Sequence, residues 1–99
     1  MNKKIKEATL VLFRKNLRGG DVVAVFPFLN ASEGYMTSYA HIGQHSEGSW
    51  EYVKEDTKPA SKEDYEELKQ ELLNIGYENI IVINRLPAKR KCAIHYNND

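Results

Sequence analysis

The alternation of hydrophobic and polar residues predicts strands in the first part of this chain. Residues 8–13 are apolar or β-branched, and Val22 to Phe26 repeat the pattern after a polar stretch with two adjacent glycines. Because glycine tolerates the positive φ of a tight reversal, we expect residues 8–28 to form an antiparallel hairpin. Pro27 has no N–H for a central ladder, so it marks the strand's end, an edge or a bulge.

Strict alternation predicts a third strand at residues 35–42. One face is small or apolar, and the other face is expected to point outward with two tyrosines and a histidine, Tyr35, Tyr39 and His41. Gly43 ends this strand. Residues 44–58 have weak periodicity and are predicted to be a long loop, which the side chain of Trp50 would anchor.

The clearest pattern in the chain is a helix that begins after Ser61. The Ser61 side chain can cap the helix, and Asp64 occupies the reciprocal position of a capping box. Gly76 ends the helix in a left-handed conformation, and Tyr77 can pack back on Leu72. The stripe expected to face the sheet consists of Tyr65, Leu68, Leu72 and Ile75, with Leu73 at its edge. The charged residues expected to face away are Glu63, Glu66, Glu67, Lys69 and Glu71.

Residues 79–83 form an apolar run that is predicted to be a central strand, and residues 92–96 can add an edge strand. The order is then strand, strand, strand, helix, strand. It indicates an α+β fold with two layers, an antiparallel sheet of four to five strands with one amphipathic helix packed on one face. Residues 1–99 are expected to form a single domain, with flexible ends at 1–7 and 97–99.

Composition narrows the class of protein. The chain is 41% hydrophobic and 28% charged, with a formal net charge of zero and one cysteine, which is typical of a globular domain. A single cysteine excludes an intrachain disulfide and suits a reducing compartment. The apolar runs are too short for a signal peptide or a membrane span. We therefore expect a soluble, cytoplasmic protein.

Charge is unevenly spread along the chain. The first 20 residues and residues 80–99 are mostly basic, whereas residues 55–79 are mostly acidic, so the fold can present a basic and an acidic face. A nucleic acid is one possible partner: the N-terminal lysines, Arg85 and the basic run 89–91 would contact phosphates, and Tyr39 or Trp50 would stack on bases. The neutral total does not favour it. The acidic helix face can instead meet a basic protein surface.

The densest group of hydrogen-bonding side chains surrounds Gly43. Imidazole, amide, hydroxyl and aromatic groups lie within a few residues of this break, which is more than a framework segment needs. We therefore expect a binding site, with no catalytic residue assigned, composed of Tyr39, His41, Gln44, His45, Ser46 and Trp50. The alternative is structural: the two histidines and Gln44 would only tie down the loop.

Metal binding and catalysis are less well supported by spacing. His41 and His45 with Cys92 and His95 would supply four zinc ligands, but Gly43 interrupts the first pair, and the second pair points to opposite faces of a strand. No metal or cofactor is predicted. For an enzyme, His45 is the natural acid or base. Its neighbour Ser46 diverges from it, so no triad is indicated, and an enzyme using His45 is retained only as the alternative.

The stretch Ser38-Tyr-Ala-His-Ile-Gly-Gln-His-Ser46, followed by 57–61, 65–68 and 75–77, resembles a group of small bacterial, phage and mobile-element proteins with no established activity. In that group a hairpin and a Ser-Tyr-x-His-x-Gly-Gln-His stretch precede a helix that ends Ile/Leu-Gly-Tyr. The resemblance covers residues 20–83 and implies a shared fold and surface, but no mechanism. The function expected is a small non-enzymatic accessory protein that binds another macromolecule through residues 39–50, first a protein and second a nucleic acid.

Overall fold

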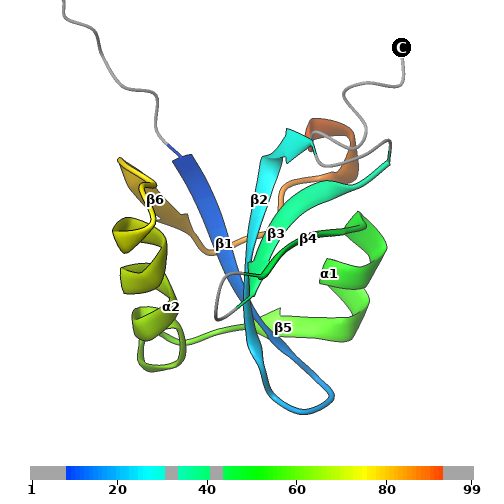
Figure 1. Ribbon diagram of the computed structural model, residues 1–99. Helices are drawn as coiled ribbons and strands as arrows, with labels where there is room; N and C mark the ends of the chain where they lie inside the picture. Colours follow the sequence, from blue (N-terminus) through cyan, green and yellow to red (C-terminus); the bar gives the residue numbers. More distant parts are fainter. Residues whose placement is uncertain (1–8, 31–33, 41–43, 93–99) are drawn as a thin grey trace, which may run out of the picture.

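The computed structural model describes residues 9–30, 34–40 and 44–92. In these ranges the chain forms one sheet, two α-helices and one 3-10 turn (Figure 1). The elements are β1 (Thr9–Asn16), β2 (Val22–Asn30), β3 (Met36–Ala40), β4 (Gln44–Gly48), α1 (Trp50–Asp56), β5 (Thr57–Pro59), α2 (Lys62–Asn74), β6 (Ile80–Ile83) and the turn η1 (Lys89–Lys91). The predicted α+β class is confirmed.

Strand β1 is the centre of the sheet because it has three partners. The strand order is β4-β3-β2-β1-β5, and each neighbouring pair on this path is antiparallel. The edge of β1 that faces away from β2 is shared: β6 pairs with residues 9–12 in parallel, and β5 pairs with residues 14–16. The antiparallel prediction is therefore correct for every pair except β1 and β6. The predicted order omits β4, α1 and β5.

The β1–β2 hairpin is the one that the sequence predicts. Gly19 and Gly20 turn the chain with φ of +84° and +76°, which residues with a Cβ rarely adopt. Farther along β2, the register with β3 shifts between Phe26 and Asn30. Pro27 lies within this irregularity, inside β2 rather than at the end of the strand.

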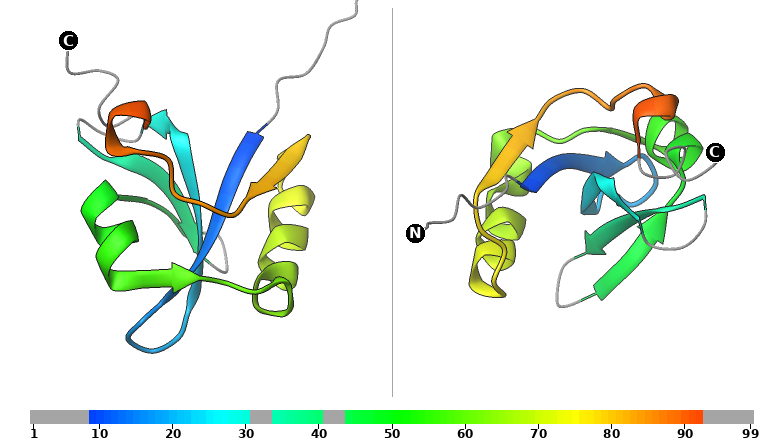
Figure 2. Two further views of the ribbon diagram at one scale, coloured as in Figure 1. Left: turned by 180° about the vertical axis from the view of Figure 1, so that it is seen from behind. Right: turned by 90° about the horizontal axis from the view of Figure 1, so that it is seen from above.

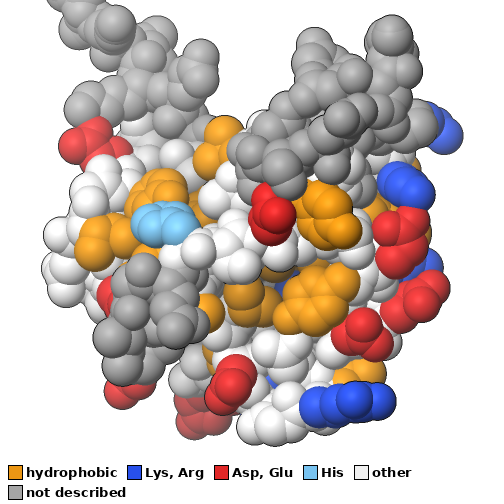
Figure 3. All heavy atoms as spheres, turned by 45° about the vertical axis from the view of Figure 1, so that its right-hand side comes forward, with side chains coloured by type: hydrophobic (Ala, Val, Ile, Leu, Met, Phe, Trp, Pro, Cys, Tyr) orange, Lys and Arg blue, Asp and Glu red, His pale blue; other side chains and the backbone are white. Residues whose placement is uncertain are grey.

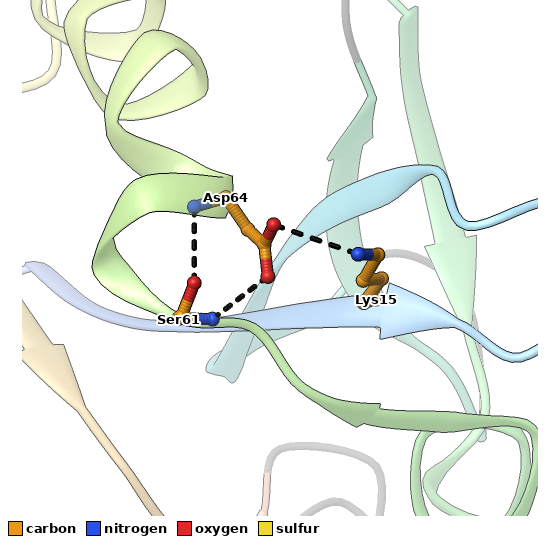
Figure 4. A network of polar contacts seen from close by, with 3 residues as sticks. All are labelled: Lys15, Ser61 and Asp64. Carbon is orange, nitrogen blue, oxygen red and sulfur yellow. Dashed lines mark hydrogen bonds and ion pairs between the residues drawn. The ribbon is translucent and has the colours of Figure 1, made fainter.

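Helix α2 also begins and ends where the sequence predicts. The Ser61 hydroxyl accepts a hydrogen bond from the Asp64 N–H at 3.2 Å, and the Asp64 carboxylate accepts one from the Ser61 N–H at 3.1 Å (Figure 4). This is a complete capping box. At the other end Gly76 has φ of +117°, and the Tyr77 N–H donates to the Leu72 carbonyl at 3.1 Å. That bond belongs to a Schellman motif, which fixes the direction in which Tyr77 leaves the helix.

Side chains cover both faces of the sheet, with α2 on one side and α1 with η1 on the other (Figure 2). The core on the α2 face consists of Val11, Phe13, Ala24, Phe26, Tyr39, Leu68 and Leu72. The core on the α1 face consists of Leu12, Val23, Val25, Met36, Val53 and Cys92. The predicted arrangement of two layers with one helix describes the α2 face alone, because α1 adds a covering layer on the second face.

Residues 44–58 are not the long loop that weak periodicity predicts. They form β4, α1 and the start of β5. Helix α1 has seven residues, too few to display a helical period, but Ser49 caps it by accepting from the Tyr52 N–H at 3.0 Å. Trp50 does anchor the segment, because its indole Nε1–H donates to the Pro87 carbonyl at 2.9 Å. This bond ties α1 to the chain that follows β6.

The apolar run at 79–83 is not a central strand. It forms β6, which pairs only with β1 among the described strands, and Ile81 is 48% exposed. The run takes this position because β2 already occupies the opposite edge of β1. Cys92 closes η1 rather than beginning a strand. The rest of the predicted final strand and the predicted flexible ends lie outside the described residues, at 93–96, 1–7 and 97–99.

Candidate functional site

The candidate site is built on the hairpin of β3 and β4. In its register Tyr39 is opposite His45, and Ser38 is opposite Ser46. Neighbouring residues of a strand point to opposite faces, so the first pair lies on the α2 side of the sheet and the second on the α1 side. The structure therefore brings Tyr39 and His45 together, with ring centroids 4.7 Å apart and ring planes at 66°. It separates both from Ser46.

Tyr39 is not a surface residue. It was predicted to lie on an outward face, but its side chain is 0% exposed and belongs to the core under α2. The alternation along β3 is correct, but both faces of the strand are covered, so alternation alone does not tell which one meets water. The Tyr39 hydroxyl donates to the carboxylate of Glu71 in α2. Glu71 was expected to face away and instead ties the helix to β3.

Tyr77 belongs to this group, although it was not among the residues predicted to form the site. Its ring stacks on that of Phe26, with centroids 5.1 Å apart, and its hydroxyl oxygen lies 3.1 Å from His45 Nε2, within hydrogen-bond distance. Burial raises the pKa of Tyr77, so the hydroxyl stays protonated at neutral pH. The available signal was Gly76, because a glycine cap fixes the path of the next residue.

These side chains line an open hollow beside the C-terminal end of α2. Its walls are Tyr39, His45, Ile75, Gly76 and Tyr77. Ile75, which was expected to face the sheet, is 48% exposed. In Figure 3 the pale-blue imidazole is bordered by hydrophobic side chains. The last turn of the helix therefore leaves apolar surface in contact with water next to the sheet's outermost strand. We call this site the His45 hollow.

A second hollow lies farther along the same side of α2. Its lining residues are Gly20, Asp21, Val22, Ala40, Asp64, Glu67 and Leu68. Glu71 lies between the two hollows, because residues 67, 71 and 75 are on successive turns of one helix face. The Asp64 carboxylate lies 3.5 Å from Lys15 Nζ (Figure 4), and its hydrogen bonds with Ser61 lower its pKa. We call this carboxylate-lined site the acidic hollow.

Ser46 and Trp50 lie on the opposite side of the sheet. Trp50 is half-buried and packs against the core on the α1 face, and Lys54 Nζ lies 5.6 Å from the centroid of its ring. Ser46 is exposed and lines a separate hollow with residues that include Ser38, Ser49 and Tyr52. The set of residues predicted from the sequence is therefore divided. Tyr39 and His45 are on one face, and Ser46 and Trp50 are on the other.

Two residues of the predicted site are not fully placed. His41 lies outside the described residues, and Gln44 is placed only through its backbone, as the first residue of β4. Of the four zinc ligands considered, His45 and Cys92 are described. Cys92 lies in the core on the α1 face, where burial raises the pKa of its thiol to about 11. Across residues 9–30, 34–40 and 44–92, no group of three acidic, histidine or cysteine side chains is arranged to hold a metal.

The described basic residues of the nucleic-acid alternative lie beyond β6. Lys89 forms an ion pair with Glu51 of α1, on the face of the sheet opposite the His45 hollow. Tyr39, one of the two side chains expected to stack on bases, is buried. The N-terminal lysines lie outside the described residues. The exposed basic side chains of this region are Arg85, Lys89, Arg90 and Lys91.

Arg14, which directly follows the apolar run 8–13, is a buried charge. It is 8% exposed. Its Nε donates to Thr57 Oγ1 at 2.8 Å, and its Nη2 donates to the carbonyls of Val53 at 3.1 Å and Thr57 at 3.0 Å. These carbonyls lie at the C-terminal end of α1, where backbone acceptors lack helical partners. Arg14 therefore stabilises the end of α1 and is not part of either hollow.

In the part of the chain that the structure describes, the His45 hollow lacks the full set of groups for nucleophilic catalysis. A nucleophile needs a base, and the base needs a third group to orient it. His45 meets Tyr39 edge to face, which does not orient a proton as a carboxylate does. The raised pKa of Tyr77 opposes its ionisation. The geometry instead provides an apolar hollow with two polar tips, which suits the binding of a side chain.

Comparison with models of protein families, with curated proteins and with solved structures gives no match. Neither α-helix of the described residues is long and apolar enough to cross a membrane. The resemblance of residues 20–83 to small bacterial, phage and mobile-element proteins stays a prediction. Function is therefore inferred from the geometry of the hollows.

Proposed function

We propose that this protein is a non-enzymatic binding module that holds a segment of another protein at the His45 hollow. One observation carries the proposal: the exposed apolar side chain of Ile75, at the end of α2, lies in a hollow beside the outermost strand of the sheet. Ile75 is 48% exposed, and β4 has no partner on its outer edge among the described strands. Exposed apolar groups and open strand edges are both features through which proteins bind one another.

The walls of the hollow are held in place before any partner arrives. Tyr77 is fixed by the helix cap and by its stacking on Phe26, and His45 is held between Tyr39 and Tyr77. Walls that are already ordered lose little conformational entropy on binding. This rigidity supports a site that receives a partner's side chain without reorganisation.

The proposal keeps the β3–β4 hairpin as the binding region but changes its members. His45 remains a member of the site, and the buried ring of Tyr39 packs against it. Tyr77 and Ile75 are added, whereas Ser46 and Trp50 belong to the other face. An accessory role of phage or mobile-element type, suggested by the resemblance, and a cytoplasmic location, suggested by the single cysteine, are part of the same proposal.

An enzyme that uses His45 is the second candidate, because one observation favours it. The imidazole lines a hollow and lies 3.1 Å from the Tyr77 hydroxyl, a distance at which a proton can be exchanged. The two candidates differ in what Ile75 contributes. A binding module needs its apolar surface, whereas acid–base chemistry needs the imidazole.

Affinity capture with matched variants tests the binding function. Ile75→Glu places a charge in the hollow, and Ile81→Glu places the same charge on β6 at a residue with the same 48% exposure. We expect the wild type and Ile81→Glu to retain one common partner protein from native cells, and Ile75→Glu to lose it. Circular dichroism must show that all three are folded. Equal capture by the two variants would remove the His45 hollow from the interface.

A further inference from the structure

Strand β6 is an outer strand of the sheet, and all of its side chains are aliphatic. Its sequence is Ile-Ile-Val-Ile, and among the described strands it pairs only with β1 (Figure 1). Edge strands of natural proteins are usually protected by charged side chains, proline or a bulge, and residues 80–83 have none of these. Ile81 is 48% exposed. An apolar edge of this kind favours pairing with another strand.

The backbone groups of β6 that point away from β1 belong to Ile80 and Val82. The Asn79 carbonyl accepts a hydrogen bond from the Thr9 N–H at 2.9 Å, so Asn79 directs its backbone groups toward β1. Because this direction alternates along a strand, Ile81 also faces β1, and Ile80 and Val82 face outward. No other described strand lies on that side of β6. The N–H and C=O groups of these two residues are therefore available to an added strand.

An antiparallel second copy of β6 fits this edge in one register. With Ile81 opposite Ile81 of the second copy, Ile80 of each copy is opposite Val82 of the other. Both residues of such a pair direct their backbone groups at each other, so each pair exchanges two hydrogen bonds. A pair centred on Val82 would instead place Ile80 opposite Asn84, which lies outside the strand. The outward backbone groups of β6 therefore select the register centred on Ile81.

The same register covers apolar side chains on both faces of the strand. Ile81 meets Ile81 of the second copy in a non-hydrogen-bonded pair, whose Cα atoms are about 4.5 Å apart and whose side chains lie closest together. On the other face, Ile80 and Val82 pack against the core under α2, and each meets an aliphatic side chain of the second copy. Removing these side chains from water favours the pairing.

Charge also favours a second copy of this chain as the added strand. Glu78 lies two residues before β6 and Arg85 lies two residues after it, and both are exposed. In an antiparallel pair the beginning of one strand lies beside the end of the other. Glu78 of each copy therefore comes to the same end of the pair as Arg85 of the other copy. The formal net charge of the chain is zero, so two copies do not repel each other at long range.

We infer that this protein forms a dimer by antiparallel pairing of β6 with β6 of a second copy, centred on Ile81, which joins the two sheets. The His45 hollow stays open in this dimer, because β4 is at the other end of the strand order. The inference therefore goes beyond the proposed function and does not rest on it. Two strands of four residues bury less than the area of about 1,200 Å² at which stable interfaces begin. We expect a weak dimer, with a Kd of about 10–100 μM.

Sedimentation equilibrium with matched variants tests the dimer. The full chain between about 5 and 500 μM should show a monomer–dimer equilibrium. Ile81→Glu places two carboxylates opposite each other and should weaken dimerisation at least about tenfold. Ile75→Glu adds the same charge at a residue with the same 48% exposure, outside β6, and should leave the Kd unchanged. Circular dichroism must show that both variants are folded.

Two further measurements test the register. Ile81→Lys should also dimerise at least about tenfold more weakly than the wild type. An equimolar mixture of Ile81→Glu and Ile81→Lys should form a heterodimer, because position 81 of one copy faces position 81 of the other. In the wild type, amide hydrogen exchange at Ile80 and Val82 should slow as the protein concentration rises. Exchange at Ile81 should change less, because its N–H faces β1.

Several results would overturn the inference. One is a chain that stays monomeric at about 500 μM, well above the expected Kd. Another is equal weakening of the dimer by Ile75→Glu and Ile81→Glu, and a third is a mixture of the two charge variants that does not associate. If the chain is monomeric and Ile81→Glu loses a protein that the wild type captures from cells, the edge of β6 binds another protein and the dimer is wrong.

Discussion

Replacing Arg14 with methionine should be one of the most destabilising single changes on the α1 face. Arg14 is 8% exposed and makes three hydrogen bonds to the end of α1, one to the Thr57 hydroxyl and two to the carbonyls of Val53 and Thr57. Methionine fills similar space but donates none of them. The Val53 carbonyl keeps the Thr57 hydroxyl as a donor. The Thr57 carbonyl loses the guanidinium donor, and the C-terminal end of α1, which carries partial negative charge, loses the positive charge of Arg14.

The size of the effect follows from these contacts. A buried acceptor left without its donor costs about 1–3 kcal/mol, and hydrogen bonds to a charged group contribute about 1.5–3 kcal/mol. Methionine recovers a part, because it no longer buries a charge. We therefore expect the free energy of unfolding to fall by about 2–4 kcal/mol. For a domain of this length that corresponds to a midpoint temperature lower by about 8–16 °C.

Urea unfolding followed by circular dichroism measures this change. Arg18→Met is the control, because Arg18 is exposed in the β1–β2 turn and should cost no more than about 0.5 kcal/mol. Arg14→Lys keeps the charge but not the planar set of donors, so its free energy of unfolding should lie between those of the wild type and Arg14→Met. A free energy of unfolding for Arg14→Met within about 0.5 kcal/mol of the wild type would refute this account of α1.

Three further predictions concern other groups. Tyr39→Phe removes the hydroxyl that donates to Glu71 and should lower the free energy of unfolding by about 1 kcal/mol in urea. Hydrogen bonds hold the pKa of Asp64 below its usual 3.8. The ionised carboxylate therefore stabilises the folded protein fully above pH 3.8, and this stabilisation is lost as the pH falls through the lower pKa of the folded state. In thermal melts from about pH 6 to pH 2, the midpoint temperature of Asp64→Asn should therefore fall less with acid than that of the wild type. Burial raises the pKa of Cys92 to about 11 from 9.0, and its side chain is fully buried, so a thiol reagent at about pH 8 should react at least about a hundredfold more slowly with the folded than with the urea-unfolded protein.

The parts of the fold that the sequence predicts are those set by local chemistry. A capping box involves four consecutive residues and a glycine cap involves two, so the sequence predicts both the beginning and the end of α2. The hairpin of β1 and β2 follows from two apolar runs and adjacent glycines. Each of these signals is complete before any distant contact forms.

The parts that the sequence does not predict depend on contacts across the chain. Strand β4, Gln-His-Ser-Glu-Gly, has little intrinsic preference for a strand and is one because β3 pairs with it. Helix α1 is short and depends on Arg14 and Trp50 to hold its two ends. Tyr39 is buried because both faces of the sheet are covered, and the alternation of residues along a strand does not show whether one face or both faces are covered. Of the two residues of the expected site that lie on the α2 face, Tyr39 is buried and His45 is exposed.

The shared edge of β1 has a consequence for synthesis of the protein on the ribosome. Among the described strands β1 is made first, yet the partner of its residues 9–12 is β6, residues 80–83. Until β6 has been made, this part of β1 has an unpaired backbone edge, and such edges are known points of aggregation. The nascent chain would therefore benefit from a chaperone until β6 emerges, and a chain truncated before residue 80 would be prone to aggregate.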